Sequence, residues 1–146
     1  MVRDSRKVLF EYCKTISNAD FTSTHSSFGR GGSIRNLIVH IANTYEFWIG
    51  KEFLKKEMVF TDYACVTGME DAVRLFNAVD HLMEEFFSAA ENPGSDDIKA
   101  VIREENSLSA FKLFTHVITH EFHHKGQILS LSRQLGYVPV DTDIMR

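Results

Sequence analysis

The chain has 146 residues and is 44% hydrophobic with 12 phenylalanines, a composition that supports one folded core and excludes a disordered chain. Its net charge is −4 and its Lys and Arg residues form no run, which argues against a nucleic-acid partner or an anionic membrane surface. Cys13 and Cys65 form no C-x-x-C motif, and the N-terminus has no long apolar run. We therefore expect a single cytoplasmic domain covering residues 1–146, without a disulfide framework.

The first of four segments with helical apolar spacing covers roughly residues 4–17. Its apolar stripe is Leu9, Tyr12, Cys13 and Ile16. Because Cys13 belongs to this stripe, we interpret it as a core residue and not as a reactive thiol. The glycine-containing segment 18–32 predicts a loop.

The second predicted helix begins at Ser33, a favourable N-cap, and ends near Gly50. Its apolar arc is Ile34, Leu37, Ile38, Ile41, Tyr45 and Trp48. His40 lies on one flank of this arc, where a lone histidine is more often a packed core-edge residue than a metal ligand. Residues 51–66 predict no definite element.

The third predicted helix begins at Thr67, which forms a capping-box pattern with Glu70, and ends before Pro93-Gly94. Its buried stripe is Ala72, Phe76, Val79, Met83, Phe86 and Ala90. His81 lies off that stripe, so we expect it in solvent. Residues 95–107 fit either a loop or a short hairpin.

The fourth predicted helix runs from about Ser109 to Leu135 and stops at Gly136. Unlike the others it is apolar on two faces. One face carries Leu113, His116, Val117, His120, His124, Gln127, Ile128, Leu131 and Leu135. The opposite face carries Phe111, Phe114, Ile118, Phe122 and Leu129. Because both apolar faces of such a helix must be buried, we expect a second subunit to bury one of them in a homodimer. The alternative is that loops of the same chain bury it.

Four of the seven histidines lie within nine residues of this helix. His120 and His124 are four residues apart, so both rings leave one face and can bind one ion. Two imidazoles need a third ligand, and His40 is the histidine that an antiparallel bundle would bring near them. These helices predict an all-α, up-down-type four-helix bundle with a metal site between its second and fourth helices.

The remaining histidines are weaker candidates for metal ligands. We expect His116 to have a packing or hydrogen-bonding role, and His123 to be exposed or to support a metal ligand from outside. His25 lies in the first loop and has no feature that favours a function. The sequence HEFHH at 120–124 also matches the zinc-protease motif H-E-x-x-H, with Glu121 as general base. The third histidine of the extended motif is absent, which makes a peptidase the weaker interpretation.

Two segments, SIRNLIVHIANTYEFWI and HVITHEFHHKGQILSLSRQLG, resemble the DinB-like family of metal-binding four-helix bundles. The resemblance covers most of the chain and implies that His40, His120 and His124 are the metal ligands. Where the family often has Arg, this chain has Lys125. Many relatives are dimeric, which agrees with the second apolar face of the fourth helix.

The resemblance also implies a chemistry. Family members with known activity are mostly thiol-dependent enzymes, namely transferases that use thiols such as bacillithiol and related mycothiol-dependent isomerases. We therefore expect a metal-dependent thiol S-transferase acting on small electrophiles, with Zn or Ni as the ion. The alternatives are a metal-dependent hydrolase, with Glu121 as a possible base, and a non-catalytic metal-binding stress-response protein.

Overall fold

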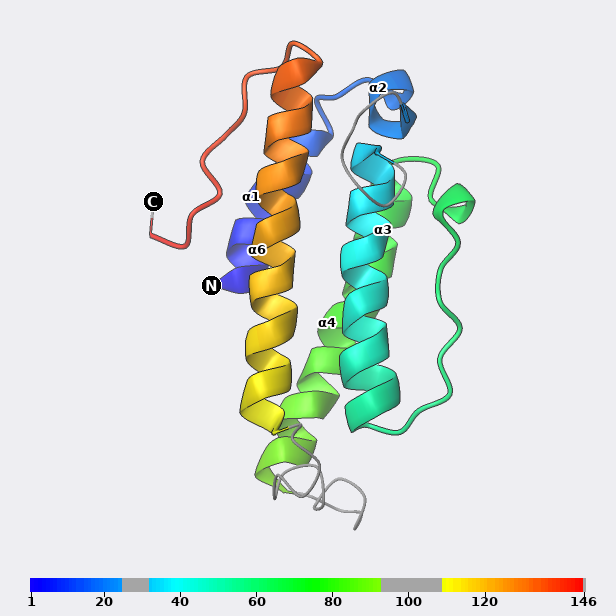
Figure 1. Cartoon of the computed structure of the whole chain (residues 1–146), viewed down its shortest axis with the longest axis vertical. Helices are drawn as coiled ribbons and strands as arrows, with labels where there is room; N and C mark the ends of the chain where they lie inside the picture. The colour runs from blue at the N-terminus through cyan, green and yellow to red at the C-terminus, as the bar shows by residue number, and fades with distance from the viewer. Residues whose placement is uncertain (25–31, 93–108, 146) are drawn as a thin grey trace.

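The computed structural model describes residues 1–24, 32–92 and 109–145, and the described residues are helical or irregular. Four main helices form a bundle, which confirms the predicted all-α class (Figure 1). The helical elements are α1 (Val2–Cys13), α2 (Asn18–Thr22), α3 (Ile34–Tyr45), η1 (Glu46–Phe53), η2 (Tyr63–Cys65), α4 (Met69–Glu91) and α6 (Ala110–Gln134). No helix in these three stretches is long and apolar enough to span a bilayer.

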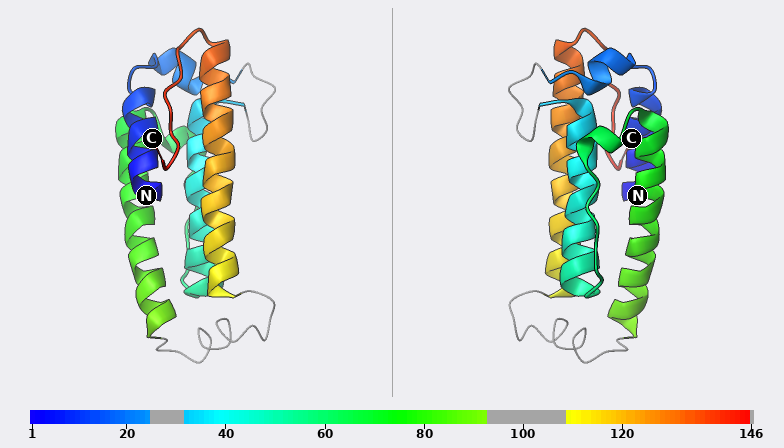
Figure 2. Two further views of the ribbon diagram at one scale, coloured as in Figure 1. Left: turned by 90° about the vertical axis from the view of Figure 1, so that its left-hand side faces the viewer. Right: turned by 90° about the vertical axis from the view of Figure 1, so that its right-hand side faces the viewer.

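The direction of the main helices places α3 and α6 antiparallel and side by side (Figures 1 and 2). In Figure 1, α1 runs upwards, α3 and α4 run downwards, and α6 runs upwards again. Successive main helices therefore do not all alternate in direction. α3 and α4 run the same way, because residues 54–68 return along the bundle before α4 begins. Since α1 is shorter than α4 and α6, it lies beside only the upper part of the bundle (Figure 2).

The predicted second helix is one continuous helical segment, α3 followed by η1. Ser33 is its N-cap and accepts a hydrogen bond from the Asn36 amide at 3.0 Å, as the sequence predicts. From Glu46 onwards the turns widen to π-helix, so the segment reaches Phe53 instead of ending near Gly50. Gly50 is enclosed, because a Cβ atom there would lie 2.8 Å from the Met58 sulfur.

The bounds of α6 match the sequence-based prediction closely. The Ser109 side chain caps its first turn by accepting from the Lys112 amide at 3.1 Å. Gly136 follows the helix with a φ of 92°, a left-handed conformation that favours glycine. The Tyr137 amide then donates to the Ser132 carbonyl at 3.0 Å, which satisfies one of the last carbonyls of the helix.

Three boundary predictions are wrong. α1 ends at Cys13, not near residue 17, and part of the predicted loop 18–32 is the short helix α2. α2 is stabilised by the Ser17 hydroxyl, which accepts from the Asp20 amide. The N-cap of α4 is Gly68, because Thr67 donates its amide and hydroxyl to Asp71 instead of forming a capping box with Glu70. His25 and the segment 95–107 lie outside the described residues.

The core contains most of the predicted apolar positions. All four residues of the first stripe are buried, and in α4 Leu82 is buried more deeply than the predicted Met83. The second apolar face of α6 is partly covered within the chain, where the Phe114 ring meets the Phe87 ring of α4 at 5.5 Å between centroids. Phe111, on the same face, is 78% exposed.

Candidate metal centre

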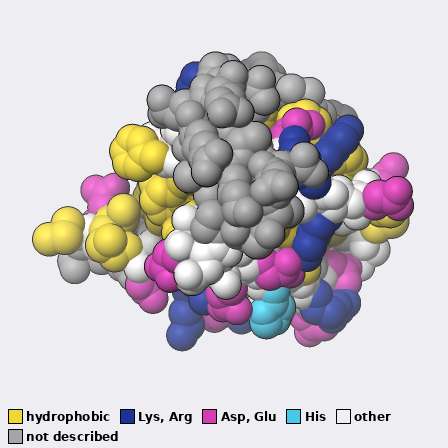
Figure 3. Space-filling model, turned by 90° about the horizontal axis from the view of Figure 1, so that it is seen from below, with side chains coloured by type: hydrophobic (Ala, Val, Ile, Leu, Met, Phe, Trp, Pro, Cys, Tyr) yellow, Lys and Arg dark blue, Asp and Glu magenta, His cyan; other side chains and the backbone are white. Residues whose placement is uncertain are grey.

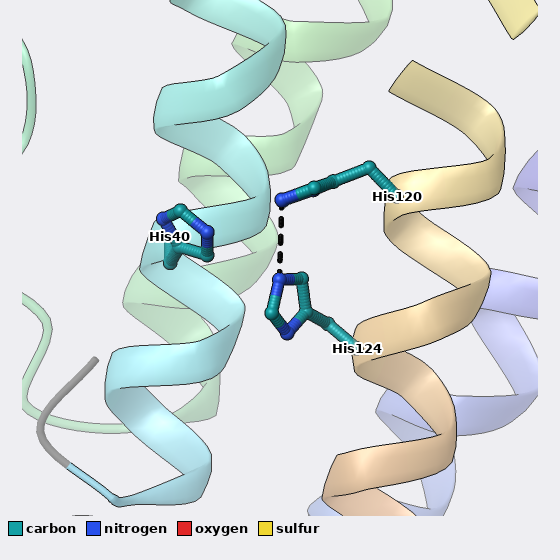
Figure 4. Close-up of side chains that lie close together, drawn as sticks. All are labelled: His40, His120 and His124. Carbon is teal, nitrogen blue, oxygen red and sulfur yellow. Dashed lines mark hydrogen bonds between the residues drawn. The ribbon is translucent and has the colours of Figure 1, made fainter. Parts of the chain in front are cut away.

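Three histidines from two neighbouring helices meet in the bundle (Figure 4). His40 comes from α3, and His120 and His124 come from consecutive turns of α6. One nitrogen atom from each ring lies within 4.8 Å of the other two, so the three side chains could hold a metal ion. His124 is buried, and His40 and His120 are half-buried. The predicted grouping of these residues between the second and fourth main helices is confirmed.

The distance between the two α6 rings fits a shared ion. The Nε2 atoms of His120 and His124 are 3.1 Å apart. Two imidazole nitrogens bound to one ion at about 2.0–2.1 Å are expected about 2.9–3.4 Å apart for bond angles between 90° and tetrahedral. Two facing nitrogen lone pairs at this distance repel unless a proton or a cation lies between them, so the same spacing suits either an N–H···N hydrogen bond between the two rings or a shared metal ion.

Gln127 determines which nitrogen of His124 is available. The His124 Nδ1–H donates to the Gln127 side-chain carbonyl at 2.6 Å, which leaves the Nε2 lone pair directed at His120. The Gln127 amide nitrogen donates in turn to His123 Nε2 at 3.1 Å. His123 is exposed, as predicted, and thus supports the orientation of Gln127 from the helix surface.

His120 is held in its neutral form. Burial, together with the neighbouring histidines, His124 first among them, lowers its pKa to about 4. Its Nδ1 atom is buried and has no hydrogen-bond partner among the described residues. A neutral ring has a lone pair for a cation at neutral pH, so the donor set of three imidazoles fits a divalent transition-metal ion.

His116 is placed beside the three histidines but not among them. Its ring is 5.8 Å from that of His120 and 5.3 Å from that of Trp48, measured between centroids. The ring is exposed at its outer side. The prediction of a packing role therefore agrees with its contacts, and its partner is Trp48 of η1.

Glu121 is not positioned as a general base, contrary to the role considered from the sequence. Only 1% of the residue is exposed, and its carboxylate accepts hydrogen bonds from Arg6 at 2.8 and 3.0 Å and from the Tyr45 hydroxyl at 2.7 Å. Lys125 Nζ lies 2.9 Å from the same carboxylate. Burial opposes the charge of Glu121, but Arg6 and Lys125 outweigh it and lower the pKa.

These residues, with Asp80, form a buried ion network that ties the bundle together behind the histidines. Arg6 of α1 binds Glu121 of α6 and, at 2.6 Å, Asp80 of α4, while Tyr45 of α3 completes the set. The sequence analysis missed this network. Glu121 and Lys125 are four residues apart between two apolar faces of α6, and this spacing could have indicated a buried ion pair. No local pattern indicates Arg6, which is 115 positions from Glu121.

The remaining nucleophiles do not enter the centre. Burial raises the pKa of Cys13 to about 12, which confirms that it is an unreactive core thiol. Cys65 is exposed in η2, and both cysteines are free.

A histidine from α3 that faces two histidines four apart on α6 is the arrangement implied by the resemblance noted above. The sequence over residues 1–146 matches the DinB family. The chain belongs to this family. No curated protein matches the chain. As a DinB protein, the chain thus combines the family's sequence with a three-histidine group that could hold a metal ion, on the helices that the sequence predicts.

Proposed function

We propose that this DinB protein binds one divalent metal ion through His40, His120 and His124 and catalyses the transfer of a small-molecule thiol to an electrophile. The observation that carries the proposal is the convergence of three imidazoles on one point, with the Nε2 atoms of the α6 pair 3.1 Å apart. We expect Zn or Ni, because both accept imidazole nitrogen.

The number of ligands favours catalysis over a structural role. Structural zinc sites commonly have four protein ligands, whereas catalytic sites keep a position for water or substrate. The group found among the described residues contains three. A bound divalent ion would supply positive charge that favours the thiolate form of a substrate thiol.

The reaction proposed is a substitution. A sulfur–carbon bond forms as the bond from that carbon to its leaving group breaks, and the leaving group departs with the bonding electrons. The thiol proton passes to solvent. Within the chain, His40, His120 and His124 define where the sulfur binds, and Gln127 keeps the Nε2 atom of His124 directed towards that point.

The structure offers less support for a hydrolase. Its candidate base, Glu121, is buried and bound to Arg6, and so cannot reach a water molecule at the histidines. The non-catalytic alternative is a protein that binds the ion but accelerates no reaction. A conjugation assay distinguishes this non-catalytic protein from a transferase.

The test is a conjugation assay on metal-loaded protein. Cysteine, glutathione, bacillithiol and mycothiol are each offered with 1-chloro-2,4-dinitrobenzene, and formation of the thioether is followed by absorbance. We expect acceleration with at least one thiol and its loss after chelation of the ion. Stoichiometric metal binding without any acceleration would replace the transferase with the non-catalytic alternative.

A further inference from the structure

A hollow lies on the surface of the bundle next to the candidate metal centre. Its volume is about 400 Å³, within the range of pockets that bind small molecules. It lies between η1 and the first turns of α6. Its lining includes Trp48, Phe111, Leu113, Thr115, His116 and Thr119.

The hollow adjoins the three histidines at one side chain, His116. His116 lines the hollow, and its ring lies between Trp48 at 5.3 Å and His120 at 5.8 Å. A molecule in the hollow would therefore contact the neighbour of a proposed ligand. We infer that one small molecule can occupy the hollow and present an atom towards the histidines.

The lining indicates what kind of group fits. Trp48, Phe111 and Leu113 provide apolar surface, and Thr115 adds a methyl group. Lys112 is the charged residue among the described lining residues, and a lysine can cover apolar surface with its stem while its ammonium stays in water. A charged group placed against the apolar walls would lose part of its hydration, which opposes its binding there.

We propose that this hollow is the subsite for the body of the electrophile, and that it selects an uncharged aromatic or branched alkyl group. The inference rests on the proposed function, because it assigns the second substrate of the thiol transfer. The electrophilic carbon would lie on the His116 side, towards the thiol, and the apolar body would pack on Trp48. The sulfur–carbon bond forms there, and the leaving group departs with its electron pair.

The chain offers a direct probe of this subsite, since Trp48 is its single tryptophan. Binding is measured by quenching of its fluorescence with 4-nitrotoluene and with 4-nitrobenzoate, which differ in charge. N-acetyltryptophanamide serves as the control for collisional quenching. We expect saturable quenching by 4-nitrotoluene and at least tenfold weaker binding of 4-nitrobenzoate. Equal or tighter binding of the carboxylate, or quenching of the nitrotoluene that never saturates, overturns the proposal.

A matched pair of substitutions at one position locates the binding. Thr115→Glu places a charge in the lining and should weaken 4-nitrotoluene binding at least tenfold, whereas Thr115→Val should bind it at least as tightly as the wild type. Equal affinities in the two variants contradict the assignment. If Thr115→Glu does not fold, the difference in affinity between 4-nitrotoluene and 4-nitrobenzoate for the wild-type protein still tests the proposal.

This experiment separates the subsite from the proposed function. The quenching needs no thiol, so it can succeed in a protein that shows no conjugation, in which case the subsite stands and the transferase fails. If conjugation occurs but Thr115→Glu leaves probe binding and the KM for the aryl electrophile unchanged, the transferase stands and the subsite is wrong.

Discussion

At the scale of single residues, each histidine on α6 has a different environment although they share one helix. His120 and His124 face His40, while His123 faces solvent and supports Gln127. We predict that His120→Ala abolishes stoichiometric binding of Zn²⁺ or Ni²⁺, because it removes one of three ligands. His123→Ala should change the affinity less than about tenfold, because direct outer partners of metal ligands contribute about 10–100-fold and His123 acts only through Gln127. Isothermal titration calorimetry on both variants checks this, and equal losses would contradict the assignment of the faces.

Glu46 gives a second prediction at this scale. The residue is 8% exposed, its Oε2 atom has no hydrogen-bond partner in the described part of the chain, and burial raises its pKa to about 6. Because the folded protein binds this proton more tightly than the unfolded chain does, stability is lost as the pH rises from about 4.5 through 6.

Glu46→Gln should therefore raise the free energy of unfolding by roughly 1–2 kcal/mol at pH 8 and leave it nearly unchanged at pH 4.5. Urea denaturation at the two pH values measures the difference. Glu57→Gln, at an exposed position, is the control and should have little effect at either pH. A stabilisation of the same size at both pH values would show that the carboxylate charge is not its cause.

At the scale of elements, the buried ion network links all four main helices. Arg6 is 5% exposed and binds both Glu121 and Asp80, whereas Arg3, on the same helix, binds Asp80 from a side chain that is 58% exposed. Removing one partner of a buried ion pair typically costs about 3–5 kcal/mol, while exposed pairs contribute about 0–1 kcal/mol.

We predict that Arg6→Met destabilises the fold by about 3–5 kcal/mol and that Arg3→Met costs less than about 1 kcal/mol. Combining Arg6→Met with Glu121→Met should cost less than the sum of the two single changes, because it leaves no unpaired carboxylate. Guanidinium denaturation of the wild type and the four variants measures these differences in the free energy of unfolding. Equal costs for the two arginines would mean that the network adds no more stability than a surface pair.

The elements also show what could be predicted from the sequence. The histidine positions and the ends of α6 follow from local spacing and caps, and both were predicted correctly. The widening of the helix after Tyr45 was not predicted, because the apolar arc with α-helical spacing continues through Trp48 and no residue there marks a change of turn. The start of α4 was misassigned because Thr67 has two acidic residues within reach, and bonds Asp71 instead of Glu70.

Long-range ion pairs were the other feature that the sequence did not predict. No sequence pattern links Arg6 to Glu121, so their contact appears only once the helices are packed. Without that contact, Glu121 was a reasonable candidate base from the motif H-E-x-x-H. The metal ligands were predictable for the opposite reason, since two of them are four apart on one helix.

At the scale of the whole molecule, apolar side chains are not evenly distributed over the surface. Seen from its lower end, hydrophobic side chains gather at the left edge, while acidic and basic side chains are interspersed along the lower and right edges (Figure 3). Phe87 is 46% exposed and Phe111 is 78% exposed. A groove of about 330 Å³ lies beside Phe87 and Phe114, next to the N-terminus of α1.

We propose that the surface around Phe87 and Phe114, beside this groove, forms a twofold homodimer contact, because burying a phenylalanine is worth roughly 1.5–3 kcal/mol relative to exposure. Light scattering coupled to gel filtration should give twice the mass of one chain for the wild type and a single-chain mass for Phe87→Glu. Phe60→Glu, at a phenylalanine 41% exposed on the segment after η1, is the control and should remain dimeric. A wild-type protein that is monomeric at micromolar concentration would contradict the dimer.

The central claim is that His40, His120 and His124 bind one ion together. Anomalous diffraction from crystals of Zn²⁺- or Ni²⁺-loaded protein, collected at the absorption edge of the metal, tests it most directly. We expect one peak per chain between α3 and α6, at about 2.0–2.1 Å from one ring nitrogen of each of the three histidines. A peak at other side chains, or an ion bound by His120 and His124 with the His40 ring outside bonding distance, would contradict it.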